Sequence, residues 1–250
     1  MKFRMSAKRK TLLALALAIF AVAGAGCFSV PGQEDFQAGM EAFKKRDFDT
    51  ALKKWKPLAE QGDKSAQTNL GVLYYQGLGV HKDYAEAFKW YQLAAMQGYA
   101  EGEFNLGVAF AEGHGTGQDL REARKWYEFA AKQGYGPAQL MLAEMYYRGT
   151  GVGVDYETAA KWYREAADGG EPMAAHILGT LYITGQGVPK DPVEAYVWFS
   201  VAASEATSPT GKSNALKIRE MVAKGMTPAQ KTEADKKAIE WKPKTDEAGK

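Results

Sequence analysis

Apolar and small side chains recur along the chain with a fixed period of 36 residues, in four copies between residues 63 and 206. The first part of each copy has a leucine that is followed directly by glycine or alanine. An aromatic side chain stands four residues after the leucine. The four leucines are Leu70, Leu106, Leu142 and Leu178. Apolar residues every three to four positions predict an amphipathic helix. Each copy therefore begins with a helix that has one buried face.

The middle of each copy carries turn and cap signals. Two glycines two positions apart, Gly77 and Gly79 in the first copy, permit the positive φ that ends a helix and reverses the chain. Asp83 then predicts an N-cap, with Glu86 as its capping-box partner. The same position holds Asp119, Asp155 and Asp191 in the other copies. We interpret these aspartates as caps and not as catalytic carboxylates.

The last part of each copy predicts a second helix. In the first copy Ala87, Trp90, Tyr91 and Ala94 have three-to-four spacing, so large rings alternate with small residues along one predicted buried face. The ring pair recurs as Trp126-Tyr127, Trp162-Tyr163 and Trp198-Phe199. Gly98 and its equivalents follow the helix and close it. Each copy is thus expected to be one helical hairpin.

These residues resemble the Sel-one-like repeat (SLR), a relative of the tetratricopeptide repeat. The resemblance implies an all-α fold, a right-handed α-solenoid of antiparallel helix hairpins. It divides the chain into a tetratricopeptide-like hairpin at 35–62 and four SLR units at 63–98, 99–134, 135–170 and 171–206, which together make a solenoid over 35–206. Capping helices are expected over 207–241, where Thr227-Pro228-Ala229-Gln230 resembles the closing segments of SLR proteins. A charged tail is expected over 242–250.

Residues 1–26 are predicted to be a secretory signal peptide, followed by a linker at 27–34. The first ten residues carry five basic side chains and no acidic one, and an apolar run extends from Leu12 to Ala25. Two cleavage schemes stay open. Ordinary signal peptidase fits the small residues that end the run, whereas Gly24-Ala25-Gly26-Cys27 resembles a lipobox in which Cys27 is lipidated. We therefore expect an exported protein, either free in the periplasm or anchored to the outer membrane through Cys27.

Composition excludes several classes of function. Without the five basic residues of the leader the chain has 27 basic and 30 acidic residues, which does not suit a general nucleic-acid binder. One cysteine excludes a disulfide framework. His81, His114 and His176 occupy different repeat positions, so no metal site is expected. No nucleophile motif is present, and we expect no cofactor and no enzymatic activity.

The resemblance implies that the first helices line a concave, ligand-binding face. Carried over by position, it predicts partner contacts at Phe36, Met40, Phe43, Thr68, Val72, Tyr75, Phe104, Val108, Leu140, Glu144, Tyr147, His176 and Thr180. This set is mostly apolar, which suits an extended peptide or an apolar helix of a partner protein. The alternative is that half of these residues are buried between neighbouring hairpins.

The predicted function is that of a non-enzymatic protein-interaction scaffold or adaptor in the bacterial cell envelope. One alternative is a cell-wall or glycan-binding protein, which exposure of Tyr75 and Tyr147 on one face would favour. The least favoured alternative is a β-lactamase-like enzyme. That activity is described for SLR relatives that pair cysteines within each repeat, and those cysteines are absent here.

Overall fold

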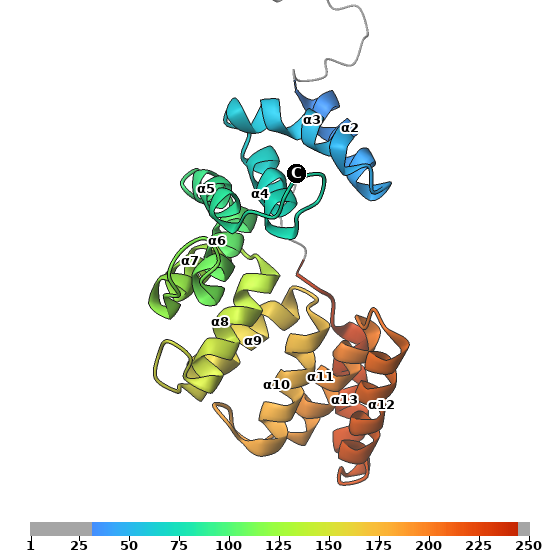
Figure 1. Cartoon of the computed structure of the whole chain (residues 1–250). Helices are drawn as coiled ribbons and strands as arrows, with labels where there is room; N and C mark the ends of the chain where they lie inside the picture. The colour runs from blue at the N-terminus through green and yellow to red at the C-terminus, as the bar shows by residue number, and fades with distance from the viewer. Residues whose placement is uncertain (1–31, 245–250) are drawn as a thin grey trace, which may run out of the picture.

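The computed structural model describes residues 32–244, which fold into twelve α-helices without a β-strand in that range (Figure 1). The helices are α2 (Gln33–Lys44), α3 (Phe48–Glu60), α4 (Lys64–Gln76), α5 (Tyr84–Ala95), α6 (Ala100–Glu112), α7 (Leu120–Lys132), α8 (Gly136–Arg148), α9 (Tyr156–Asp168), α10 (Pro172–Thr184), α11 (Pro192–Ser204), α12 (Pro209–Ala223) and α13 (Pro228–Glu240). The predicted all-α fold class is confirmed.

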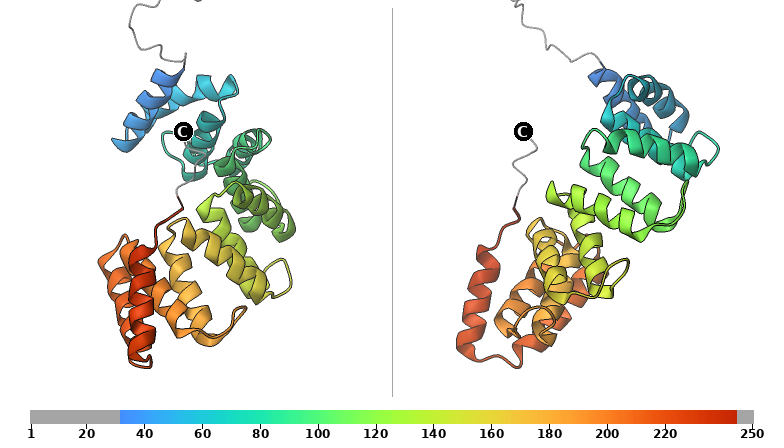
Figure 2. Two further views of the ribbon diagram at one scale, coloured as in Figure 1. Left: turned by 180° about the vertical axis from the view of Figure 1, so that it is seen from behind. Right: turned by 90° about the vertical axis from the view of Figure 1, so that its left-hand side faces the viewer.

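The helices pair into hairpins that follow one another along a curved path. The pairs α4/α5, α6/α7, α8/α9 and α10/α11 are the four repeats, and α2/α3 precede them. Each hairpin also packs on the next, as in a solenoid. Figure 2 shows α2 and α3 at one end of the curve and α12 and α13 at the other.

The predicted turns and caps are present. Gly77 (φ 73°) ends α4 and Gly79 (φ 66°) reverses the chain, both in the left-handed region that favours glycine. The Asp83 carboxylate accepts a hydrogen bond of 3.0 Å from the Glu86 N–H, which caps α5. The first hairpin lacks the glycine loop, since only residues 45–47 separate α2 from α3.

The capping boxes predicted at the aspartates are only half formed. Glu86 does not return a hydrogen bond to Asp83; its carboxylate instead pairs with Lys89 at 2.8 Å. The full reciprocal box occurs at α13, where the Thr227 Oγ1 accepts from the Gln230 N–H at 3.2 Å and the Gln230 Oε1 accepts from the Thr227 N–H at 2.9 Å. Asp83 therefore caps α5 through its own side chain alone, without the return hydrogen bond from Glu86 that would complete the box.

An aromatic ring of the second helix presses against a glycine of the first helix in most hairpins. A Cβ added at Gly71 would lie 2.5 Å from the Tyr91 ring, and one added at Gly107 would lie 2.7 Å from the Tyr127 ring. The first hairpin makes the same contact between Gly39 and Trp55. Glycine is needed at these positions because the ring occupies the place of its side chain.

The tryptophan of each Trp-Tyr pair lies further out than expected. Tyr127 is 4% exposed, whereas its neighbour Trp126 is only half-buried. Consecutive residues of a helix point about 100° apart, so the tyrosine faces its own hairpin and the tryptophan lies at the side. The prediction that both rings are core residues holds only in part for Trp90, Trp126 and Trp162, which are half-buried but still pack against core clusters. It holds for Trp198 because α12 and α13 cover α11.

The last two helices close the solenoid. Tyr196 of α11 donates a 2.6 Å hydrogen bond to Asp235 of α13, and Lys237 pairs with Glu194 at 3.2 Å. The half-buried Trp241 packs on the core of the last repeat. Beyond it Lys244 pairs with Asp168 of α9 at 2.8 Å, so the start of the predicted tail contacts the solenoid.

Within residues 32–244, no helix combines the length and the apolar character needed to cross a membrane. The predicted signal peptide, Cys27 and residues 245–250 lie outside the described residues. Export, the choice of cleavage site and lipidation at Cys27 therefore stay predictions from the sequence.

Replacing Gly107 by alanine is expected to lower the free energy of unfolding by about 1–3 kcal/mol, because the added methyl group overlaps the buried Tyr127 ring. Urea denaturation measures the change. Gly117→Ala is the matched control, since a Cβ at Gly117 would meet open space. Equal stabilities of the two variants would contradict the steric role of Gly107.

The unequal burial of the ring pair predicts unequal costs of truncation. Tyr127→Ala should lower the free energy of unfolding by about 3–5 kcal/mol, as for other large buried rings, and Trp126→Ala by clearly less. Chemical denaturation of the two variants side by side gives the order. A larger loss for Trp126→Ala would show that the tryptophan is the main core residue of α7.

Candidate partner-binding surface

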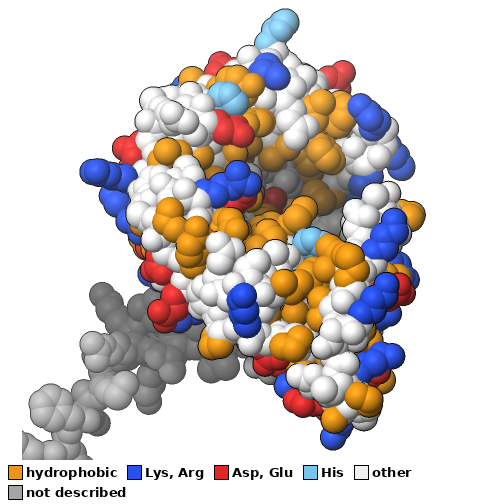
Figure 3. Space-filling view, turned by 90° about the horizontal axis from the view of Figure 1, so that it is seen from below, with side chains coloured by type: hydrophobic (Ala, Val, Ile, Leu, Met, Phe, Trp, Pro, Cys, Tyr) orange, Lys and Arg blue, Asp and Glu red, His pale blue; other side chains and the backbone are white. Residues whose placement is uncertain are grey.

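The candidate binding surface is the inner side of the solenoid, formed by the first helices. α4 contacts α6 directly, although α5 separates them in the chain, so these two first helices lie on the shorter side of the curve. Seen from below, the molecule is hollowed, and hydrophobic side chains gather around the hollow (Figure 3).

Thr68 does not belong to this surface. Its side chain is 0% exposed, and its Oγ1 donates a 3.0 Å hydrogen bond to the Lys64 carbonyl oxygen. α4 packs against α3, α5 and α6 at once, which encloses the middle of the helix. The sequence-based assignment of Thr68 as a partner contact is therefore wrong.

The predicted contacts of the first hairpin belong largely to its packing. The Phe43 and Phe36 rings lie 5.6 and 6.2 Å from the Trp55 ring, between centroids. Met40 accepts a hydrogen bond from the Asn69 amide of α4, with 3.6 Å between Nδ2 and Sδ. All three side chains are half-buried and keep only part of their surface free.

Four aliphatic and aromatic positions of α4, α6 and α8 are likewise half-buried. They are Val72, Phe104, Val108 and Leu140, each packed against a core cluster. The Phe104 ring lies 5.6 Å from Tyr127 and 5.4 Å from Tyr135. The alternative in which many predicted contacts are buried between hairpins thus describes these residues well, although part of each side chain still faces solvent.

Tyr75 joins the first repeat to the second in a cluster that we call the Tyr75 clasp, formed with Tyr84, Glu112 and His114. The Tyr75 hydroxyl donates to the Glu112 carboxylate and lies 3.0 Å from His114 Nδ1. The Tyr84 and His114 rings stack with 4.0 Å between centroids. Burial and the Glu112 carboxylate both raise the pKa of Tyr75, which keeps its hydroxyl protonated as a donor.

A second clasp lies two repeats further on. Tyr147, at 72 residues from Tyr75, donates a long 3.4 Å hydrogen bond to Gln186 and packs edge-on against Tyr156 at 5.3 Å. Tyr156 and Gln186 stand at the same 72-residue interval from Tyr84 and His114. Tyrosine thus closes every second junction between repeats. The doubled period of Tyr84 and Tyr156 could have revealed this pattern in the sequence.

The intervening junctions have smaller residues and are open. Ala111 and Leu120 replace the tyrosine pair between the second and third repeats, and a pocket of about 270 Å³ lies there with Met141 and Met145. Ile183 and Pro192 replace the pair after the fourth repeat. Together with Ile218, Met221 and Val222 of α12 they line a pocket of about 440 Å³.

Charged residues flank the first of these openings. Glu144, a predicted contact, pairs with Arg148 at 2.7 Å, and both side chains line the Ala111 pocket. Of the other predicted contacts, Thr180 is exposed and donates its hydroxyl proton to the His176 carbonyl oxygen.

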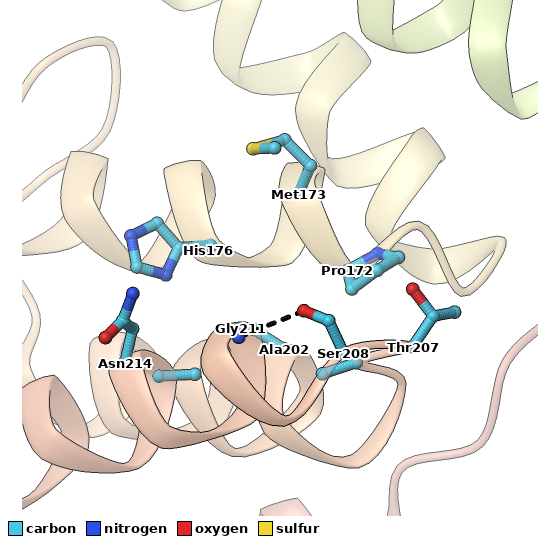
Figure 4. A pocket seen from close by; sticks show the side chains of 10 residues that line it. Pro172, Met173, His176, Ala202, Thr207, Ser208, Gly211 and Asn214 are labelled. Atoms are coloured by element: carbon cyan, nitrogen blue, oxygen red, sulfur yellow. Dashed lines mark hydrogen bonds between the residues drawn. The ribbon is translucent and has the colours of Figure 1, made fainter.

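His176 lies in a third pocket of about 310 Å³ between α10 and α12 (Figure 4). Its ring packs edge-on against Phe199 at 5.2 Å and faces Asn214 of α12. Burial lowers the pKa of His176, which favours the neutral imidazole. Ser208 opposite is already used as the cap of α12, where it accepts from the Gly211 N–H at 3.1 Å. The part of the chain described here holds no cluster of three or more His, Cys, Asp or Glu side chains suited to a metal ion.

Comparison with known proteins places these repeats in a family. The Sel1 repeat model matches residues 64–99, 100–135, 136–171 and 172–206, and each match begins one residue later than the unit predicted from the sequence. A search of curated proteins by sequence found no match.

Three solved structures have the same architecture. A protective antigen of uropathogenic Escherichia coli strains with an SLR fold is 32% identical with a TM-score of 0.69, covering 84% of this chain and 46% of its own. The chain thus spans about half the length of that protein. A Sel1 repeat protein from Oxalobacter formigenes is 30% identical with a TM-score of 0.67 and 82% of each chain covered. An immunity protein from Pseudomonas aeruginosa, 18% identical with a TM-score of 0.51 over 84% of this chain and 85% of its own, shares the fold alone. The chain belongs to the Sel1 repeat family.

Proposed function

We propose that this protein is a non-enzymatic scaffold of the bacterial cell envelope that binds a segment of a partner protein along its inner side. Sel1 repeat proteins generally serve as protein-interaction scaffolds. The observation that carries the proposal is the pair of open junctions at Ala111 and Ile183. The envelope location rests on the leader sequence.

The two open junctions are suited to anchor apolar side chains. Methionine side chains line both openings, beside aliphatic residues such as Leu120 and Ile218, and methionine adapts to the shape of an inserted group. Interfaces of this kind take most of their affinity from a few apolar anchors in well-defined pockets. A partner segment with two large apolar residues, one for each opening, fits this arrangement.

The Tyr75 and Tyr147 clasps argue against glycan binding, the alternative function. A glycan binder needs free aromatic faces, and the rings of Tyr75 and Tyr147 pack against Tyr84 and Tyr156 of their own repeats. Both hydroxyls also form a hydrogen bond to the following repeat, to Glu112 and to Gln186. The tyrosine, glutamate and histidine of the Tyr75 clasp are hydrogen-bonded to one another, which favours a role in joining two repeats. Partner binding at the open junctions therefore has the stronger support.

Site-specific photo-crosslinking in cells that naturally make the protein tests the proposed surface. A crosslinking residue at Ala111 or Thr180 should yield a discrete adduct with one envelope protein, because both positions border the inner side. The same residue at Gln92, exposed on the second helix α5, is the matched control. An adduct formed equally at Gln92, or none from the inner positions, would contradict the proposal.

Filling the Ala111 pocket should weaken binding of the partner identified in this way. Ala111→Trp places a large ring in the opening and is expected to reduce the affinity at least about tenfold, as for loss of one apolar anchor. Isothermal calorimetry with purified proteins measures the effect.

Ala85→Trp, at an exposed position of α5, controls for the added ring. Phe104→Asp is less suitable because Phe104 also packs on Tyr127 and Tyr135, so its loss disturbs the fold. Unchanged affinity in folded Ala111→Trp protein would remove this pocket from the binding surface.

A further inference from the structure

One position near the start of each first helix holds a buried side chain at the junction with the preceding hairpin. It is occupied by Gln67 in the first repeat, Glu103 in the second, Gln139 in the third and Ala175 in the fourth. The three polar side chains are only 4%, 5% and 6% exposed. A carboxyl group therefore replaces an amide at one buried junction.

The two glutamines make the same hydrogen bond. Gln67 Nε2 donates to the Ala59 carbonyl oxygen at 3.0 Å, and Gln139 Nε2 donates to the Ala131 carbonyl oxygen at 3.2 Å. Both acceptors belong to the last turn of the preceding second helix, where carbonyl groups lack partners within the helix. The amide thus ties each first helix to the hairpin before it.

Glu103 cannot make this bond in its ionised form. The equivalent acceptor is the Ala95 carbonyl oxygen, at the end of α5. One carboxyl oxygen, Oε2, already accepts a 2.7 Å hydrogen bond from Gln133 Nε2. The other has no hydrogen to donate unless the group is protonated. The start of α6 is pressed onto this end of α5, since a Cβ at Gly102 would lie 2.6 Å from Ala94 Cβ.

We propose that Glu103 is a proton-operated latch between the first and second Sel1 repeats. When protonated, its carboxyl group donates to the Ala95 carbonyl oxygen, as the glutamines do at the equivalent junctions. When ionised, it turns a carboxylate oxygen toward that carbonyl oxygen, and the junction between α5 and α6 is weaker.

The surroundings of Glu103 agree with this device. Burial raises the pKa of Glu103, and the hydrogen bond from Gln133 only partly opposes that effect. The causes of the shift are burial and this hydrogen bond alone, so no charged group contributes to it. The charged side chains on the two helices packed beside α6 are Glu86 and Lys89 on α5 and Arg121, Glu122, Arg124, Lys125, Glu128 and Lys132 on α7. Within residues 32–244 none of them forms an ion pair with Glu103, and several pair with one another.

The sign of the pH dependence follows from the raised pKa. The folded state holds the Glu103 proton more tightly than the unfolded chain, so this group stabilises the fold increasingly as the pH falls through its folded pKa. α6 carries Val108 and Ala111, so the latch also controls how firmly this part of the inner surface is held. The inference does not depend on partner binding.

Thermal unfolding of the full chain at pH 7.5 and pH 4.5 tests the latch. Glu103→Gln supplies the amide found at the other junctions and should raise the Tm at pH 7.5 by about 2–4 °C, the effect of one added hydrogen bond in a chain of this size. The gain should shrink at pH 4.5, because the raised pKa of Glu103 favours the protonated carboxyl group at the lower pH. Glu220→Gln, which removes an exposed carboxylate, should show no such dependence.

The reciprocal variant Gln139→Glu tests the same idea at the next junction, between α7 and α8. It should lower the Tm at pH 7.5 by more than at pH 4.5, because it creates a second latch. Hydrogen exchange of the wild-type protein adds a local measurement. After correction for intrinsic exchange rates, amides at the end of α5 and the start of α6 should exchange more slowly at pH 4.5 than at pH 7.5. A Glu103→Gln shift that is equal at both pH values, or exchange at this junction that does not slow, would overturn the proposal.

Discussion

The contact between an aromatic ring of the second helix and a glycine of the first decides how closely the two helices of a hairpin approach. At Gly71 and Gly107 the ring takes the space of a side chain, so the rings of Tyr91 and Tyr127 lie directly on the backbone of the first helix. Glycines with positive φ then end the first helix and reverse the chain at a fixed distance from this contact. These requirements together explain the constant 36-residue period.

With the hairpins fixed in this way, the junctions between them determine what the inner side offers. Tyrosine clasps fill alternate junctions, and smaller residues such as Ala111 leave the others open. The hairpin core is therefore uniform while the inner surface has a period of two repeats. A scaffold can change its binding surface through these junction residues without changing the contacts that hold each hairpin together.

The buried polar position held by Gln67, Glu103 and Gln139 is also a junction residue that differs between repeats. At two of the junctions the helix end presents a carbonyl oxygen that accepts a hydrogen bond from the glutamine at the start of the next helix, Gln67 or Gln139. Glutamine does so at any pH, whereas Glu103 does so only with a bound proton. A single oxygen-for-nitrogen exchange thus makes one junction of an otherwise repetitive chain sensitive to its surroundings.

The sequence by itself determined the repeats, the aspartate caps and the glycine turns, because these depend on residues close together in the chain. The all-α solenoid follows from them. Tertiary structure decided what depends on neighbouring repeats. It buried Thr68 and half-buried Trp126, which helical spacing alone does not distinguish from their neighbours. It also joined Tyr75 to His114, 39 residues away, since only the packing of one hairpin on the next brings such side chains together.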